Sequence, residues 1–501
     1  MHIKSKILDC TIRDGGYYNK WNFSDKFVSE YLKLMSKLNI EWVEIGFRKQ
    51  IEDKSYGQYI KTEDSVLQKI NIPKNISLAV MIDCSDFKTN EQLIKLSKIF
   101  KSKKKSKIGM VRIASSFEDL YYLKNIIKIL KKKNYLISIN LMKFTLLKKN
   151  QIMNFFSKVK NMGADYFYLA DSFGNCLPKN LYKISKLLMK KFDISKFGYH
   201  GHNNFNLAYK NAIIVKKLGF GLIDTSISGM GRGAGNLLLE DFTKNKLKFK
   251  QSKSLRSFIG TFMKKLKKDY RWGPSYPYFF SAKHNIHPTF VQNLLNEKKF
   301  LFKDIFSILN FLKSKDSKKF DPNIFDNFFL KTNPIKKTSN INLKKEINLY
   351  CNNPMIDKIK INSKESFKSA SLNFNKYVKS NHYDFLFICH PYRLMTEFKT
   401  IQNLNKKIIL PNFNILNTNE KKDMNLNFYN YYFSDKFFIN KNYCKYNKNL
   451  VLIFALSYCI INNIEKINLY GLSKNDENKK IIKFIDKYVK NKKLNSQILV
   501  K

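Results

Sequence analysis

Short apolar runs alternate with longer amphipathic segments through the first 240 residues of the chain. Runs that are apolar almost throughout are typical of parallel strands buried on both faces, and apolar residues at helical spacing indicate helices that cover a sheet. We expect strands at Lys6–Cys10, Trp42–Gly46, Ser77–Ile82, Gly109–Ala114, Leu136–Leu141, Tyr166–Ala170, Phe197–His200 and Leu222–Ser226. The clearest helices are expected at Asp25–Leu38, Phe117–Lys132, Gln151–Met162, Leu181–Lys191 and Asn206–Leu218. This pattern predicts an α/β protein whose first part is a (β/α)8 TIM barrel.

Polar residues cluster where the predicted strands end. They are Arg13, Asp14, Glu44, Arg48, Asp83, Arg112, Asn140, Asp171, Ser172, His200, His202 and the loop Gly229–Gly235. The carboxyl ends of barrel strands form the active-site face of this fold. A doubly wound open sheet shares the alternation, but its ligand lies at one topological switch point, so it would not need polar residues after many successive strands.

The periodicity changes after the barrel, and we divide the chain into three parts. Residues 1–250 are expected to form the barrel, residues 251–345 a helical, aromatic extension and linker, and residues 346–501 a smaller Rossmann-like α/β domain of unknown function. Strand-like runs in the last part are Tyr383–Cys389, Ile408–Leu410 and Ile467–Leu472, and helical runs are Asn449–Asn463 and Asn478–Val489. It contains no GxGxxG fingerprint or P-loop, so a nucleotide function there has no support.

The net charge of +53 raises the question of nucleic-acid binding. Only seven of the 92 basic residues are arginine, while Lys, Asn, Ile and Phe are all frequent, which is typical of AT-rich coding. The lysines are also spread along helix faces, so nucleic acid is not expected as the main partner. The chain has no uninterrupted apolar run of membrane-spanning length and no signal-peptide pattern, so we expect a cytoplasmic protein without a membrane role. Its seven cysteines are scattered, which fits a reducing compartment and argues against a thiolate zinc site.

Two histidines two positions apart, His200 and His202, stand at the end of the seventh predicted strand. Alternate side chains of a strand project to the same side, so both can bind one metal ion. Barrel closure brings the first strand near the seventh, and Asp14 can supply a carboxylate. Such a set leaves room for a bidentate 2-oxo acid and suits Mn²⁺, Mg²⁺, Co²⁺ or Zn²⁺. The alternative for Asp14 is a turn residue before Gly15 and Gly16, which does not account for Arg13 beside it.

These motifs together resemble the DRE-TIM metallolyases over roughly residues 3–290. The matching segments are Asp9–Gly15, Glu44, His200–His202 and Gly229–Asn236. The superfamily includes 4-hydroxy-2-oxovalerate aldolase, hydroxymethylglutaryl-CoA lyase and the isopropylmalate and homocitrate synthases.

The resemblance implies a role for each matching residue. Asp14, His200 and His202 would bind a divalent metal, Mn²⁺ in the first place, with Asn236 as a further ligand. Arg13 would stabilise an enolate oxygen, and Glu44 would orient Arg13; the alternative for this pair is a barrel-interior salt bridge without catalytic purpose. The residues expected to contact substrate are Arg13, Arg112, Asn140, Asp171 and Ser172.

One position departs from the aldolase pattern. Those aldolases carry a basic histidine shortly after the Arg-Asp-Gly motif, whereas this chain has Tyr17 and Tyr18. A tyrosine, with a pKa near 10, is a reluctant base at neutral pH. Tyr17 or metal-bound hydroxide is expected to substitute. Tyr276 resembles a site tyrosine of the aldolases, and packing between domains is its alternative role.

The leading functional prediction is a metal-dependent aldolase or lyase similar to 4-hydroxy-2-oxovalerate aldolase. It would make or break a C–C bond through a metal-bound pyruvate-type enolate, with a 2-oxo acid and an aldehyde as small-molecule partners. One alternative is a Claisen-type synthase that joins an acyl-CoA to a 2-oxo acid. Another is a non-catalytic basic binding protein, whose binding would depend on salt and not on Asp14. The sequence leaves open a homo-oligomer or a partner enzyme of the same pathway.

Overall fold

The computed structural model describes residues 5–296 except 52 and 54, and then 300, 302–322, 324, 328, 345–353, 356, 368–375, 377–411, 424–434, 436–446, 450–472 and 476–501. The chain divides into two compact units, Met1–Leu309 and Asn310–Lys501. The part of the predicted linker at 329–344 lies outside the described residues.

The first unit is built on a closed barrel of eight parallel strands, as predicted. The strands are β1 (Lys6–Asp9), β2 (Trp42–Phe47), β3 (Ser77–Asp83), β4 (Ile108–Ser115), β5 (Leu136–Met142), β6 (Tyr166–Asp171), β7 (Phe197–Gly201) and β8 (Leu222–Thr225). β1 closes the barrel because it pairs with β2 on one side and with β8 on the other, where Lys6 lies opposite Leu222. First and last strands are therefore neighbours, and residues that follow them meet at one rim.

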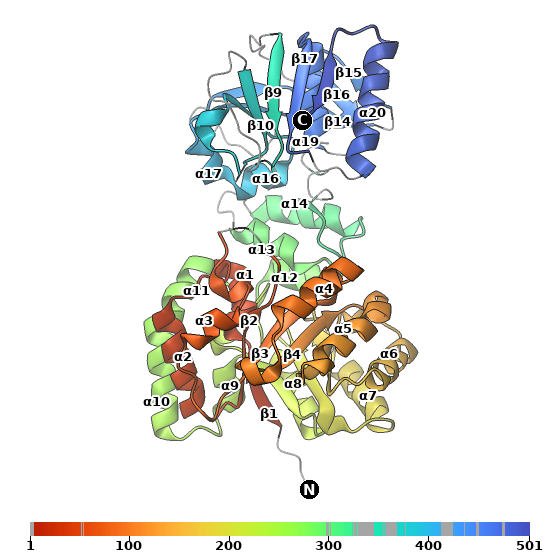
Figure 1. Cartoon of the computed structure of the whole chain (residues 1–501). Helices are drawn as coiled ribbons and strands as arrows, with labels where there is room; N and C mark the ends of the chain where they lie inside the picture. Colours follow the sequence, from red (N-terminus) through yellow and green to blue (C-terminus); the bar gives the residue numbers. More distant parts are fainter. Residues whose placement is uncertain are drawn as a thin grey trace. The chain divides into compact units, whose positions relative to one another are not determined.

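Helices surround the barrel (Figure 1). They are α1 (Thr11–Asn19), α2 (Asp25–Lys37), α3 (Asp64–Gln68), α4 (Asn90–Ile99), α5 (Leu120–Lys132), α6 (Lys149–Asn161), α7 (Pro178–Met189) and α8 (Ala208–Lys217). In α2, Phe27, Tyr31 and Met35 recur at helical spacing and are buried, while the Ser24 hydroxyl accepts the Phe27 N–H and caps the first turn. Burial of such faces on the apolar strands forms the main core of this unit.

The helices after β8 complete the first unit. They are α9 (Leu239–Thr243), α10 (Phe249–Phe258), α11 (Lys264–Tyr270), α12 (Tyr276–Lys283), α13 (Pro288–Asn296) and α14 (Phe302–Lys313), the last of which crosses the boundary between the units. α10 packs on α2, where Phe258 meets Phe27. α13 packs at the barrel rim, because the Gln292 side chain accepts the N–H of Gly233 at 3.2 Å and donates to the Tyr17 carbonyl at 3.2 Å.

The second unit contains a parallel sheet in the order β13-β12-β11-β10-β9-β17-β18. Its strands are β9 (Glu346–Tyr350), β10 (Lys368–Leu372), β11 (Phe385–Phe387), β12 (Lys407–Leu410), β13 (Leu426–Phe428), β17 (Lys466–Tyr470) and β18 (Gln497–Val500). A small sheet is made by β14 (Asn430–Phe433), β15 (Phe438–Ile439) and β16 (Tyr443–Tyr446), and the helices are α16 (Pro391–Thr396), α17 (Phe398–Gln402), α19 (Val451–Ile461) and α20 (Asp476–Asn491). The strand order runs outward in both directions from β9 and β17, as in Rossmann-like sheets.

Helix α19 is apolar almost all round, as is typical of a helix buried on all sides. It lies within the second unit, where Phe454 and Tyr458 contact Phe387 of β11. Among the described helices, none is both long and apolar enough to span a lipid bilayer.

Candidate metal centre at the barrel mouth

Asp14, His200 and His202 come together at the rim where the barrel closes. One ligand atom from each lies within 4.8 Å of the others, and all three side chains are buried. His200 is on β7 and His202 follows the strand, while Asp14 belongs to α1, which starts directly after β1. The alternative of a turn at Asp14 is wrong, because Gly15 and Gly16 continue the helix.

Close packing between α1 and the glycine-rich loop explains two of the glycines. A Cβ atom on Gly15 would lie 2.8 Å from the Met230 side chain. A Cβ atom on Gly231 would lie 2.3 Å from Asn236 Nδ2 and 2.6 Å from Asp14 Oδ2. Asn236 donates from this loop to Asp14 Oδ2 at 2.8 Å. The loop therefore brings Asn236 beside the triad, where the family resemblance expects a further ligand.

His200 is oriented by a carboxylate that the sequence analysis missed. Its Nδ1 lies 2.9 Å from Oδ2 of Asp224, which directs the Nε2 side of the ring away from that carboxylate. Burial alone would raise the pKa of Asp224, but the charge of Arg112 and the hydrogen bond with His200 hold it below its ordinary value. The sequence feature that could have indicated Asp224 is a single carboxylate inside the apolar strand segment Leu222–Thr225.

The chemistry of these side chains fits a divalent cation. Burial lowers the pKa of His202 well below 6.5, so the ring is neutral, and its Nδ1 is buried without a hydrogen-bond partner among the described residues. Burial would raise the pKa of Asp14, but the charge of Arg13 lowers it well below the ordinary value, so the carboxylate is charged. A carboxylate and imidazole nitrogens are donors that such a cation takes.

A second cluster, Cys10 with His200 and Asp224, meets the same distance limit. Burial raises the pKa of the Cys10 thiol well above its usual range, so it stays protonated. Oδ2 of Asp224 is already shared by His200 and by Arg112, whose Nη2 is 2.6 Å away. The protonated thiol therefore favours the Asp14 cluster as the candidate metal site, and its ligands remain a prediction.

A buried network of ion pairs connects to the cluster of Asp14, His200 and His202. Arg13 Nε donates to Glu44 Oε2 at 2.6 Å, and its Nη1 pairs with Asp14. The same Glu44 oxygen accepts from Arg112 Nη1 at 2.8 Å. Arg112 is fully buried and its guanidinium lies 4.3 Å from the centre of the Tyr168 ring. Glu44 and Arg112 thus connect Arg13 to the carboxylate that holds His200, and substrate contact by Arg112 remains a prediction.

The remaining predicted substrate residues lie at the ends of β5 and β6. Asn140 is buried on β5 and accepts from the Ser138 hydroxyl at 3.0 Å. Asp171 accepts the N–H groups of two loop residues at 2.9 and 3.1 Å, and burial raises its pKa to about 7. The Ser172 hydroxyl accepts the N–H of Lys143 at 3.0 Å. Asp171 and Ser172 thus fix the loops after both strands, and their contact with substrate remains a prediction.

The two predicted tyrosines occupy different environments. Tyr17 lies in α1 with the Arg232 guanidinium 5.5 Å from its ring centre, and burial, together with Asp83, raises its pKa. Tyr276 begins α12 and is 59% exposed, with its ring against Phe279. The buried tyrosine of this segment is Tyr278, whose hydroxyl lies 3.4 Å from that of Tyr18.

His287, between α12 and α13, is a further residue that the sequence analysis missed. Burial lowers its pKa well below 6.5, and the nearby charges of Arg232 and Lys143 lower it further. These two residues belong to the glycine-rich loop and the loop after β5, and His202 of the metal triad is also a neighbour. The usable signals were the rarity of histidine, with seven in the chain, and its position in an aromatic segment next to a barrel.

Comparisons with known proteins identify the family of the barrel. The HMGL-like family model matches residues 4–256. The oxaloacetate decarboxylase of Mycobacterium tuberculosis is 23% identical over 241 residues, which is 48% of this chain and 69% of that protein. The 4-hydroxy-2-oxovalerate aldolase of Desulfitobacterium hafniense is 25% identical over 242 residues, which is 48% of this chain and 70% of that protein.

The solved structures include a similar barrel. The N-terminal domain of a Bacteroides vulgatus protein is 30% identical, covers 60% of this chain and 99% of its own, and has a TM-score of 0.51. Together with the matched motifs and the geometry of the triad, these similarities place the barrel among carbon–carbon lyases. The chain belongs to the HMGL-like family, the DRE-TIM metallolyases that its motifs resemble.

Proposed function

We propose that the barrel is a divalent-metal-dependent lyase of the 4-hydroxy-2-oxovalerate aldolase type, which makes or breaks a C–C bond beside the carbonyl of a 2-oxo acid. The observation that carries the proposal is the buried Arg13 guanidinium beside the cluster of Asp14, His200 and His202. A bound divalent cation, Mn²⁺ in the first place, would act as a Lewis acid toward the carbonyl of the substrate. We place the reaction in the cytoplasm, which suits the seven free cysteines.

Arg13 is the group that stabilises the developing enolate in this proposal. Its guanidinium is held by Glu44 and Asp14 before substrate arrives, so little reorganisation is needed when negative charge appears on the carbonyl oxygen. Asn140 and the Asp171–Ser172 loop are proposed to bind the rest of the 2-oxo acid. Arg112 is proposed to act as a positioning residue, because both of its ion pairs are with carboxylates that hold Arg13 and His200.

The proton-accepting role is proposed for His287. Its lowered pKa keeps the imidazole neutral at neutral pH, and a neutral imidazole is the form that can accept a proton from the substrate. The raised pKa of Tyr17 suits a neutral phenol that donates a hydrogen bond. Tyr276, which is largely exposed, has less support as a catalytic residue.

The first experiment is exchange of the methyl protons of pyruvate in D2O, followed by NMR. We expect exchange with Mn²⁺-loaded protein and none with metal-stripped protein. The Asp14→Asn variant should bind Mn²⁺ at least about a hundredfold more weakly, since loss of a supporting residue alone costs 10–100-fold. Exchange that persists in the variant at wild-type rate, or without metal, would contradict the proposal. Failure of pyruvate alone directs the test to larger 2-oxo acids.

A second candidate reaction is decarboxylation of a 2-oxo diacid such as oxaloacetate, in line with the relative from M. tuberculosis. It is favoured by Tyr17 in place of the aldolase histidine, because decarboxylation requires no base to deprotonate a substrate hydroxyl. Loss of CO2 also leaves an enolate for Arg13 to stabilise. Turnover of oxaloacetate without turnover of any 4-hydroxy-2-oxo acid would select this reaction.

The role of His287 can be tested by its pH dependence. Because the pKa is lowered, aldol cleavage should be insensitive to pH around neutrality and fall only in acid, where the ring becomes protonated. His287→Asn should lower kcat about 10²–10⁴-fold and abolish the acid limb, with Mn²⁺ affinity unchanged. His284→Asn is the control, since that ring packs against Phe280, with ring centres 4.5 Å apart. Equal activity in both variants would remove His287 from the mechanism.

A further inference from the structure

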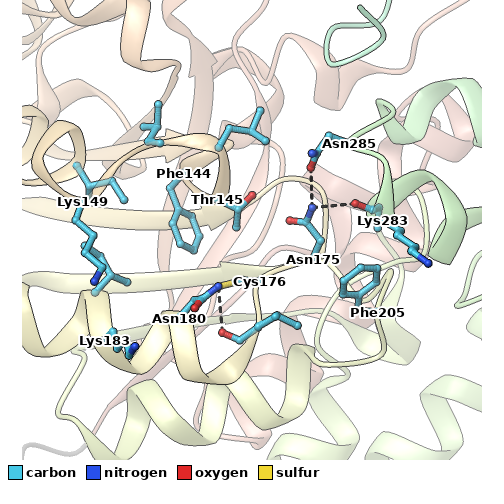
Figure 2. A pocket seen from close by; sticks show the side chains of 16 residues that line it. Phe144, Thr145, Lys149, Asn175, Cys176, Asn180, Lys183, Phe205, Lys283 and Asn285 are labelled. Carbon is cyan, nitrogen blue, oxygen red and sulfur yellow. Dashed lines mark hydrogen bonds between the residues drawn. The ribbon is translucent and has the colours of Figure 1, made fainter. Parts of the chain in front are cut away.

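A cavity of about 650 Å³ lies in the first unit, among the loops at the carboxyl ends of the barrel strands (Figure 2). It is formed by the loops after β5 and β6, the first turns of α6 and α7, and the end of α12. None of its lining residues belongs to the Asp14 cluster or to the network of ion pairs connected to it. Its size is that of a small-molecule site, and the proposed lyase reaction leaves it without a role.

The charged side chains that line this cavity are all positive. Lys149, Lys183 and Lys283 line it, and no aspartate or glutamate is among its lining residues. Lys149 and Asn180 stand in the first turns of α6 and α7, whose N-termini carry partial positive charge. Figure 2 shows Lys149 and Lys183 on one side of the cavity and Lys283 on the other. An anionic group is therefore favoured beside Lys149 and Lys183.

The rest of the lining is largely apolar. Phe144, Leu147 and Phe205 contribute to its wall, and Leu146 and Leu177 are unusually exposed for leucines at 37% and 48%. Apolar side chains that remain partly in water beside a cavity are often covered by a ligand. An anion with an apolar body would remove this surface from water.

Two polar atoms in the wall also point to a ligand. The Thr145 hydroxyl and the Asn175 side-chain oxygen are buried and have no hydrogen-bond partner among the described residues. Asn175 is held in place because its amide nitrogen donates to the Ala282 carbonyl and to Asn285, both at 2.9 Å. Figure 2 places Thr145 and Asn175 between the two lysine-bearing sides of the cavity. Both oxygens lack a partner, and a bound molecule would reach them only after a small shift of the covering side chains.

We propose that this cavity is a second binding site, separate from the metal centre, for a small amphipathic anion such as a medium-chain carboxylate. The carboxylate pairs with Lys149 and Lys183, and the chain lies along Phe144, Leu147 and Leu177. The site borders the catalytic rim, because Asp171 accepts the N–H of Asn175 in its wall. A molecule bound in the cavity is therefore expected to affect the loop that carries Asp171 and Ser172.

Calorimetric titration of the full-length protein with octanoate in the presence of EDTA tests this site independently of metal and of lyase activity. We expect saturable one-to-one binding, about tenfold tighter than hexanoate because two more methylene groups are buried. Octanol, which has no charge, should bind about tenfold more weakly, and the Lys149→Met/Lys183→Met variant should lose octanoate affinity by a similar factor. Pyruvate should not displace the bound octanoate.

The matched control is Lys158→Met/Lys186→Met, which removes two exposed lysines of the same helices that do not line the cavity. This variant should bind octanoate within about twofold of wild type, since neither lysine lines the cavity. Both double variants should unfold at the wild-type temperature, because exposed lysines contribute little to stability. Absence of saturable binding, equal losses in the two variants, or displacement by pyruvate would overturn the proposal.

Discussion

Replacing Glu44 by glutamine is expected to destabilise the barrel by about 3–5 kcal/mol, the usual cost of removing one partner from a buried ion pair. Glu44 is fully buried, and a single carboxylate oxygen accepts from both Arg13 and Arg112. The substitution keeps the shape of the side chain but leaves two guanidinium groups with less compensating charge in the barrel interior. The expected loss is therefore electrostatic and is not a consequence of a cavity.

Tryptophan fluorescence during urea unfolding measures this loss for the barrel alone. The three tryptophans, Trp21, Trp42 and Trp272, all belong to the first unit. The control is Glu30→Gln, which removes the exposed ion pair with Lys33 and should leave the midpoint unchanged. A Glu44→Gln midpoint equal to that of wild type would show that the network carries little of the stability.

The barrel could be predicted because its local and global signals agree. Each predicted strand overlaps an observed one, since parallel strands buried on both faces are apolar throughout and their ends are marked by polar residues. The predicted Leu222–Ser226, for example, is observed as Leu222–Thr225. The segment Cys10–Asn19 was harder to predict: Gly15 and Gly16 weaken a helical pattern, and only their packing against Met230 and Trp21 explains why glycine stands there.

The candidate site was predictable where a residue belongs to a local motif. His200 and His202 are close in sequence, and barrel closure brings Asp14 to them. Asp224 and His287 were missed because each reaches the site only through tertiary structure. Asp224 is a single carboxylate in a strand, and the position of His287 depends on how α12 and α13 pack on the glycine-rich loop. A sequence pattern does not show which distant residues come into contact in this way.

The second unit was predicted less completely. The helices α19 and α20 and the strands β11, β12 and β17 overlap predicted elements. β10 was not predicted, because its short segment Lys368–Leu372 carries serines and no apolar run. It is a strand because it pairs with β9 on one side and β11 on the other. Pairing in the sheet outweighs the weak local preference.

Arg13→Lys is expected to lower kcat/KM for the proposed reaction about 10²–10³-fold while the protein still binds Mn²⁺. The guanidinium donates through Nε to Glu44 and through Nη1 to Asp14, and these two bonds fix its plane. A lysine ammonium is a single point charge and cannot keep both bonds while facing a substrate oxygen. The positive charge remains in the Arg13→Lys variant, so the loss of kcat/KM measures the contribution of the orientation of the guanidinium.

Arg48→Lys is the matched control for this result. Arg48 is as buried as Arg13, and it is fixed by Asp64 and by the carbonyls of Thr62 and Ile99, outside the metal cluster. Both variants lose a buried guanidinium, so both should lose stability, but only Arg13→Lys should lose pyruvate proton exchange. Equal exchange rates in the two variants would favour the reading of Arg13 and Glu44 as a structural ion pair. Loss of proton exchange in Arg13→Lys alone would indicate that this guanidinium lies beside Asp14 in order to stabilise the enolate oxygen.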